Sequence, residues 1–246
     1  QYVEMEHGVP SYSTIRRLFM LIQPACWGDF IQHILRLHHP DWAKEDQVAI
    51  DGKSLRGSQC EAKSVRAMQM VSAFSVENAI TLGEIKTDGK SNEITAIPLL
   101  ISLLDLEGAT VSMDAMGCQK NILCALLDKG ADYLVGIKKN QPTLYAAVEA
   151  LAQNQGTSLE HKVEDYFDEG HGRTVRRRYF VFEPSEEMKA LGFSHMNTLI
   201  ATETIHSSHY APGKVSAQWR YYMTSHAKDH PKLPVYIRHH WQIESH

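Results

Sequence analysis

Apolar residues recur at two different spacings in the first part of the chain. Between residues 13 and 37 they repeat at helical spacing, and Pro24 divides this stretch into two predicted helices. We therefore expect a small helical N-terminal region over residues 1–45. Short apolar or alternating runs, which are typical of strands, follow at residues 48–50, 68–76 and 80–86.

The middle of the chain alternates between helical and strand patterns. Helices are predicted at residues 95–106, 119–129 and 142–153, and strands at residues 110–113 and 132–137. A strand–helix–strand order implies parallel neighbours with right-handed crossovers. Because a three-strand meander followed by parallel strands is the layout of a ribonuclease-H-like fold, we expect an α/β protein with a ribonuclease-H-like mixed sheet and flanking helices.

The pattern returns to strands from residue 159 onwards. A hairpin is predicted with Gly170 and Gly172 in its turn, and further strands are predicted at residues 196–205 and 218–224. Residues 233–246 then resume helical spacing. We therefore expect one large domain over residues 46–246, with a β-rich insertion at about residues 156–232.

Two aspartates stand where apolar strand patterns end. Asp51 follows the run VAI, and Asp114 follows the run TVSM. Since the first and fourth strands of a ribonuclease-H-like sheet are neighbours, the two carboxylates would face each other. Burying a carboxylate without a partner costs several kcal/mol, so the pair predicts a bound cation. For either aspartate alone, a turn-capping role is the simpler interpretation.

A third carboxylate, Glu244, lies in the last apolar segment. Three carboxylates suit two magnesium (or manganese) ions about 4 Å apart, with Asp51 bridging both and Asp114 and Glu244 each holding one. Such a site activates a water or a DNA 3′-hydroxyl and stabilises the leaving oxygen during phosphoryl transfer. Because like charges disfavour joint ionisation, we expect a raised pKa for Asp51, the most enclosed of the three.

Composition adds few constraints to this interpretation. The chain has 246 residues, of which 43% are hydrophobic and 22% charged, and it has no apolar run near the ~20 residues of a membrane span. The four cysteines lack zinc-site spacing, and no export signal is visible, which favours a cytoplasmic protein with free thiols. The net charge of −4 does not indicate a DNA-binding protein, although a local basic strip can bind DNA.

Several motifs together resemble a known family. They are VAIDGKSLRGS, GEIKTDGKSNEITAIPLL, VSMDAMGCQKNI, YLVGIKKNQPTL and IRHHWQIES, in this order, with GVPSYSTIRRLF near the start. The chain is similar to insertion-sequence transposases of the ISAs1 type, including the H-repeat-associated proteins of enteric bacteria. This resemblance implies a DDE transposase with Asp51, Asp114 and Glu244 as its catalytic, metal-binding acids. It also implies a bacterial homodimer that acts on double-stranded DNA, at element ends and target, and is associated with the nucleoid when bound.

The chain departs from the wider family pattern near its end. Ile237 and His240 stand where the group has Tyr and Arg, and the sequence stops two residues after Glu244. Because helix ends fray, we expect Glu244 to be loosely held in a truncated, weakly active or inactive copy.

Basic residues near the acids and on the insertion are candidates for contacts to DNA phosphates. They are Lys53, Arg56, Lys138, Lys139, Arg176 and Arg178. For the insertion arginines, a solvated surface paired with nearby acids is an equally open interpretation. Two alternatives to a transposase remain at this point: a ribonuclease-H-like nuclease that never joins strands, and a non-enzymatic DNA-binding remnant.

Overall fold

The computed structural model describes most of the chain. The described residues are 8–23, 26–27, 29–30, 33–34, 37, 46–55, 67–87, 93–155, 162–170, 173–208 and 215–245. The predicted DNA-contact residue Arg56 and about half of the second predicted N-terminal helix lie outside these ranges. Within them, no helix is both long and apolar enough to cross a membrane.

A nine-stranded mixed sheet runs through the described part of the chain, in the order β3-β2-β1-β4-β5-β9-β8-β7-β6. Its strands are β1 (Gln47–Leu55), β2 (Met68–Ser75), β3 (Ile80–Thr87), β4 (Thr110–Met113), β5 (Asp132–Ile137), β6 (Lys162–Gly170), β7 (Arg173–Phe182), β8 (Thr198–Ser208) and β9 (Val215–Thr224). β1, β2 and β3 form an antiparallel meander, whereas β4 and β5 add to β1 in parallel. This order confirms the expected ribonuclease-H-like mixed sheet.

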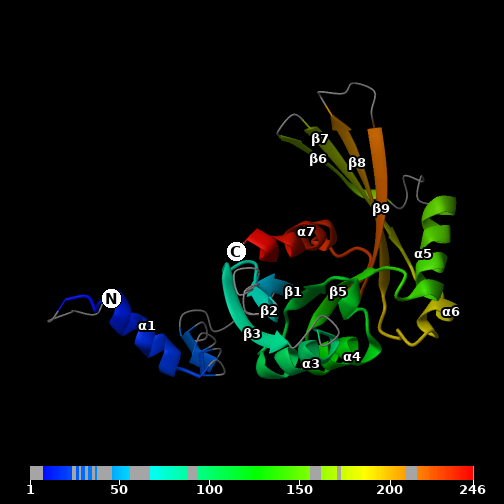
Figure 1. The fold of residues 1–246 in the computed structure, drawn as a ribbon. Helices are drawn as coiled ribbons and strands as arrows, with labels where there is room; N and C mark the ends of the chain where they lie inside the picture. Colours follow the sequence, from blue (N-terminus) through cyan, green and yellow to red (C-terminus); the bar gives the residue numbers. More distant parts are fainter. Residues whose placement is uncertain are drawn as a thin grey trace.

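Helices cover the two faces of the sheet (Figure 1). The helices of the described part of the chain are α1 (Tyr12–Leu21), α3 (Glu93–Leu103), α4 (Lys120–Asp128), α5 (Pro142–Gln155), α6 (Glu186–Lys189) and α7 (Leu233–His239), with 3₁₀ turns η4 (Ala115–Gly117) and η5 (His240–Ser245). Alternate β1 residues point to opposite faces: Val48 and Ile50 pack with α3 and α4, whereas Ala49 packs with Ile243 of η5. Asp51 is two residues after Ala49 on the same strand, so its side chain lies on the same face of the sheet and faces η5.

The predicted β-rich insertion continues the sheet of the core. β9 pairs antiparallel with β5 near Leu134–Ile137, and β8, β7 and β6 follow outward from it. Figure 1 shows these strands rising beyond the core on the side of α7. The α7 helix packs its Tyr236 and Ile237 against Tyr179 and Tyr222 of these strands. The insertion is thereby joined both to the edge of the core sheet and to the last helix.

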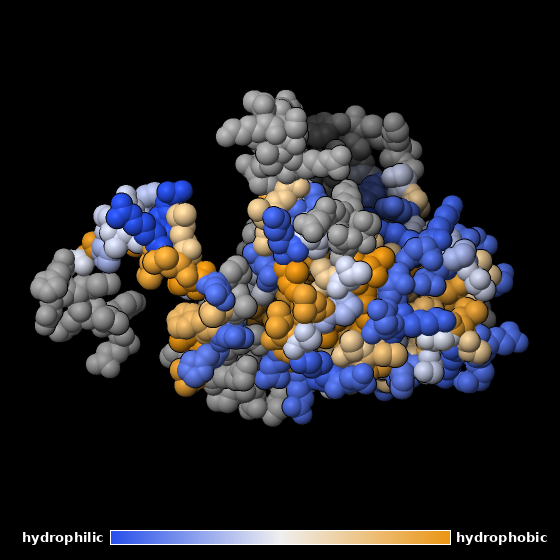
Figure 2. Space-filling view, turned by 60° about the horizontal axis from the view of Figure 1, so that its bottom comes forward, coloured by the Kyte–Doolittle hydropathy of each residue, from blue (hydrophilic) through white to orange (hydrophobic). Residues whose placement is uncertain are grey.

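The N-terminal helix α1 lies apart from the sheet in Figure 1, and none of its residues is buried. Ser11 caps its first turn by accepting a hydrogen bond from the backbone N–H of Thr14 at 3.2 Å. Its apolar residues, among them Leu18 and Phe19, are exposed, and Figure 2 shows orange surface along one side of this region.

Three predicted boundaries differ from the structure. β1 does not end at Asp51 but runs to Leu55, because β2 pairs with it along this whole length. The helix predicted to begin after Thr95 begins at Glu93, so Pro98 lies inside it. The final segment is not one helix, since α7 tightens into the 3₁₀ turn η5 from His240 onwards.

Candidate active site

Asp51 and Asp114 lie at adjoining positions of two neighbouring parallel strands. The register pairs Ile50 of β1 with Met113 of β4, and each aspartate is the next residue in its strand direction. Neighbouring strands are about 4.8 Å apart, so the two backbones hold these carboxylates close together. The predicted pairing of the first and fourth strands thus places the two acids side by side.

The carboxylate of Asp114 also organises the turn that follows it. Its Oδ1 accepts a hydrogen bond from the backbone N–H of Met116 at 2.8 Å, which caps the 3₁₀ turn η4. The loop after β5 clamps this turn: Asn140 donates to the carbonyl of Ala115 at 2.6 Å, and Gln141 donates to the carbonyl of Cys118 at 2.8 Å. The turn-capping interpretation of Asp114 is therefore correct for one oxygen, and the second oxygen remains for another ligand.

Burial is the main electrostatic influence on Asp51. Removal from water raises the pKa of this carboxyl above its ordinary value, and the negative charges of Asp114 and Glu244 raise it further. The backbone N–H of Gly52 and the charge of Lys53 act in the opposite direction. The expected rise in pKa therefore occurs, although desolvation contributes more to it than the like charges do.

Glu244 approaches the pair from the η5 turn. Its neighbour Ile243 is 2% exposed and packs on Ala49 and Phe74, which fixes η5 against β1. Lys53 donates a hydrogen bond from Nζ to the carbonyl of Ile243. The segment bearing Glu244 is therefore attached to the strand of Asp51, while the Glu244 side chain itself is exposed.

The three acids do not form a finished metal site. Among the described residues, no three His, Cys, Asp or Glu side chains are grouped closely enough to hold one metal ion. Asp51 and Asp114 provide oxygen donors, which are the ligands that magnesium and manganese prefer. The two aspartates therefore fit such an ion, without Glu244 as a third grouped ligand.

A buried polar network underlies the site and was not predicted. The side-chain amide of Gln47 on β1 donates to the Ser112 hydroxyl at 2.8 Å and to the carbonyl of Tyr236 at 2.7 Å. Nδ1 of His240 lies 3.1 Å from the same hydroxyl. Burial lowers the pKa of His240 to about 4, so its imidazole is neutral at pH 7. The network ties α7 and η5 to the strands that carry Asp51 and Asp114.

A fourth carboxylate lies on the opposite face of β1. Glu93, in the first turn of α3, is 8% exposed, and its carboxylate fills the space beside Gly52. A methyl group at Gly52 would lie only 2.6 Å from the Glu93 carboxyl carbon. Glycine at this position therefore lets α3 approach the strand directly beside Asp51.

Asp114 opens into a cleft of about 510 Å³ that is lined by basic and aromatic side chains. The predicted DNA-contact residues Lys138 and Lys139 line this cleft and are exposed. Arg220 of β9 and Trp241 of η5 complete its far side. Positive charge therefore lies beside a metal-binding candidate, an arrangement suited to a phosphate substrate.

The other predicted DNA-contact residues lie differently. Arg176 stacks over the ring of Phe167, with its guanidinium carbon 5.0 Å from the ring centre. Arg178 forms an ion pair with Glu203, which is only 8% exposed. This partner lies on β8, whereas the open alternative paired the insertion arginines with acids nearby in the sequence, so that alternative stays a prediction. Lys53 is held by η5, as described above.

Sequence reasoning missed Arg177, Arg220 and Arg238, which line a shared hollow between the insertion and α7. Strand alternation separates Arg177 from Arg176 and Arg178 but does not tell which face is covered by α7. His240 was recognised only as a departure from the family pattern. Its burial beside Ser112 has no signature in the local sequence.

Comparison with known proteins identifies the family of this chain. The family model described as "Transposase DDE domain" matches residues 42–246. "H repeat-associated putative transposase YbfD" of Escherichia coli (strain K12) is 38% identical over 190 residues, which cover 76% of this chain and 74% of that protein. "H repeat-associated putative transposase YhhI" of the same strain is 33% identical over 252 residues, which cover 100% of this chain and 66% of that protein.

The chain spans about two thirds of the length of some of these relatives, such as 66% of "Putative protein YbfL", to which it is 34% identical. Among solved structures, a piggyBac transposase synaptic complex with hairpin DNA is similar over 82% of this chain and 39% of that one, with 9% identity and a TM-score of 0.43. That structural likeness is too weak to support an inference. The sequence matches confirm the family resemblance, and the chain belongs to the transposase DDE domain family, in its H-repeat-associated branch.

Proposed function

We propose that this chain is the catalytic part of a DNA transposase that cuts and joins DNA by metal-dependent phosphoryl transfer. The observation that carries the proposal is the convergence of Asp51 and Asp114 on adjoining parallel strands, beneath the turn that bears Glu244. A pair of acids in this position matches the chemistry of the family, in which metal-held oxygens replace a protein nucleophile.

Transposase DDE domains generally use divalent metal ions. We propose two magnesium or manganese ions, with Asp51 shared between them and with Asp114 and Glu244 each holding one. When bound, the ions would activate the attacking hydroxyl and offset negative charge at the phosphorus. The raised pKa of Asp51 favours this role, because a cation relieves the desolvation and repulsion that the metal-free carboxylate experiences.

The proposed substrate is double-stranded DNA, at the ends of the element and at its target, bound by a homodimer within the nucleoid. Lys138 and Lys139 would contact phosphates at the mouth of the Asp114 cleft. Arg56, Arg176 and Arg178 are weaker candidates, and Lys53 would position η5. The neutral His240 would hold η5 over the acids without adding charge.

The experiment that tests the proposal uses a donor plasmid carrying the genomic DNA that flanks the reading frame, and a supercoiled target plasmid. Purified protein is incubated with both plasmids in magnesium, and the products are separated on agarose gels and sequenced. We expect ends released from the donor and joined to the target, at a low rate because the Glu244 side chain is exposed on η5. Asp51→Asn and Asp114→Asn should each remove both products while leaving the circular dichroism spectrum unchanged.

The outcomes separate the candidate functions. Cleavage without joining would indicate a nuclease of the ribonuclease H kind, and DNA binding without cleavage would indicate a non-enzymatic remnant. Cleavage that persists in both aspartate variants would overturn the assignment of these residues. Lys228→Gln is a matched surface control, because Lys228 pairs with Glu183 away from the site and should leave both products intact.

A further inference from the structure

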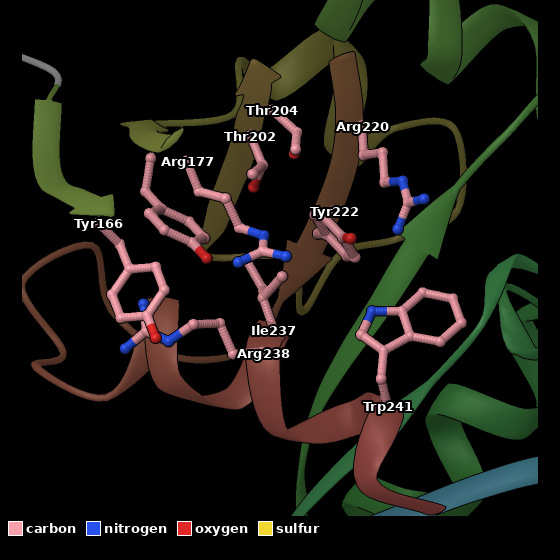
Figure 3. Close-up of a pocket in the computed structure, with 10 residues that line it drawn as sticks. Tyr166, Arg177, Thr202, Thr204, Arg220, Tyr222, Ile237, Arg238 and Trp241 are labelled. Atoms are coloured by element: carbon pink, nitrogen blue, oxygen red, sulfur yellow. The ribbon is translucent and has the colours of Figure 1, made fainter. Parts of the chain in front are cut away.

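A second hollow, next to the Asp114 cleft, is lined mainly by arginine and aromatic side chains (Figure 3). It encloses about 450 Å³ between the insertion strands and the α7–η5 segment. We propose that this hollow, through Arg177, Arg220 and Arg238, holds a backbone phosphate of the DNA whose scissile bond lies in the Asp114 cleft. This inference rests on the proposed function and extends it to a second DNA-contact site.

The three arginines come from separate elements and line one hollow. Arg177 lies on β7, Arg220 on β9 and Arg238 on α7, and Figure 3 shows Arg177 directed toward the middle of the hollow. No Asp or Glu side chain is among the described residues that line it. Three guanidinium groups around one hollow favour an anion, and their planar donors match phosphate oxygens.

Aromatic rings hold these arginines in place. The guanidinium carbon of Arg238 lies 4.5 Å from the ring centre of Tyr166, and that of Arg177 lies 6.0 Å from the same ring. The guanidinium carbon of Arg220 lies 5.4 Å from the ring centre of Trp241. Stacking of this kind fixes the direction of the N–H groups before a ligand arrives, which lowers the entropic cost of binding.

A buried hydroxyl in the same hollow lacks a hydrogen-bond partner. Thr202 of β8 is 2% exposed, and its Oγ1 makes no hydrogen bond within the described structure. It lines the hollow beside Thr204, on the sheet face that carries Arg177. Buried hydroxyls normally find partners, so an unpaired one at this place points to a hydrogen-bonding ligand.

The hollow is continuous with the proposed active site. Arg220, Tyr222 and Trp241 line both this hollow and the cleft that contains Asp114. DNA lying along the cleft therefore passes Arg220 and reaches Arg177 and Arg238. This continuity favours a phosphate of the DNA substrate over a free phosphate or nucleotide as the occupant.

The test measures DNA affinity across a series of salt concentrations, by fluorescence anisotropy of a labelled duplex in EDTA. The Arg177→Gln/Arg238→Gln variant should bind roughly tenfold or more weakly, and its plot of log affinity against log salt should flatten by about 0.9, the value for one phosphate that is no longer neutralised. Lys189→Gln/Lys228→Gln, which removes the same charge at surface ion pairs outside the hollow, should match the wild type. An unchanged salt slope in the arginine variant would overturn the inference.

A second variant keeps the inference testable if the arginine variant does not fold. Thr202→Val has nearly the same shape but lacks the unpaired hydroxyl, so its melting temperature should rise while its DNA affinity falls severalfold. Unchanged affinity in this variant would contradict a ligand at Thr202. Saturable stabilisation by inorganic pyrophosphate that requires Arg177, together with an unchanged DNA salt slope, would assign the hollow to a free anion and overturn the inference.

Because these measurements contain no divalent metal, their outcome is independent of the cleavage assay. If the binding measurements contradict the arginine site while cleavage still depends on the aspartates, only the second contact site is refuted. A wild-type protein that does not bind DNA at all would instead refute the proposed function.

Discussion

Gly52 offers a direct test of how closely the strand of Asp51 is packed. In Gly52→Ala the added methyl carbon would lie 2.6, 2.7 and 2.8 Å from the three carboxylate atoms of Glu93. Favourable van der Waals contacts between carbon atoms begin at about 3.5 Å, so either the buried Glu93 side chain or the strand has to move by about 1 Å. Overpacking of this kind costs about 1–3 kcal/mol, which lowers the melting temperature by roughly 2–12 °C for a domain of this size.

The same change should impair catalysis more than stability. A shift of β1 at Gly52 displaces the adjacent Asp51, and a misplacement of about 1 Å in a catalytic group can cost ~100-fold in rate. Thermal melts and metal-dependent cleavage rates measure the two effects. Gly83→Ala is the matched control, because its methyl group would meet the flexible end of Leu100 at 3.2 Å, away from Asp51.

A double-mutant cycle with Glu93→Ala identifies the cause. If the added methyl group clashes with the Glu93 carboxylate, Gly52→Ala should destabilise the Glu93→Ala protein much less than it destabilises the wild type. The expected coupling free energy is about 1–2 kcal/mol. Strictly additive losses in the cycle would refute the packing argument, and so would a Gly52→Ala protein that is as stable as the wild type.

Three further expectations concern the acids and their supports. Asp51→Asn should be inactive yet more stable at pH 7 by roughly 0.5–2 kcal/mol. The folded-state pKa of Asp51 is raised, so the wild type loses stability as pH rises from the ordinary pKa of 3.8 through that raised pKa, and urea melts at pH 3 to 7 should show the difference between the two proteins increasing. The pH dependence of stability has the opposite sign for His240, because its folded-state pKa is lowered from 6.5 to about 4. As pH falls through this range, the wild type should lose on the order of 3 kcal/mol of stability relative to His240→Gln, and parallel stability curves for the two proteins would contradict this expectation. Asn140→Ala removes the 2.6 Å hydrogen bond to the carbonyl of Ala115 and should lower the free energy of unfolding by about 1 kcal/mol, while the cleavage rate falls by more than this loss of stability explains. An unaffected cleavage rate would show that this hydrogen bond does not position Asp114.

The local sequence was sufficient to predict the arrangement of β1 to β5 and the neighbouring positions of Asp51 and Asp114, but not the pairing of β9 with β5. Short apolar runs mark the buried strands, and the strand–helix alternation from residue 110 to residue 153 leaves few topologies. The position of Asp51 inside β1, with four further residues after it, was not predictable, because it depends on how far β2 pairs along the strand.

The surroundings of the acids depend on contacts between distant segments. Gln47, Ser112 and His240 come together only when α7 packs on the sheet, across sequence separations of 65 and 128 residues. Likewise, strand alternation in RTVRRRYFVF separates Arg177 from its neighbours, but only the docking of α7 decides which face becomes the hollow. Such tertiary arrangements leave no periodic signal in a single sequence.

The central claim is that Asp51 and Asp114 share a divalent metal site. The most direct measurement is anomalous diffraction from crystals of the protein grown with manganese, at a wavelength near the manganese absorption edge. We expect a peak between the two carboxylates, with Glu244 drawn toward it, and no such peak for Asp51→Asn crystals. A wild-type map with manganese elsewhere, or with none at Asp51 and Asp114, would contradict the account.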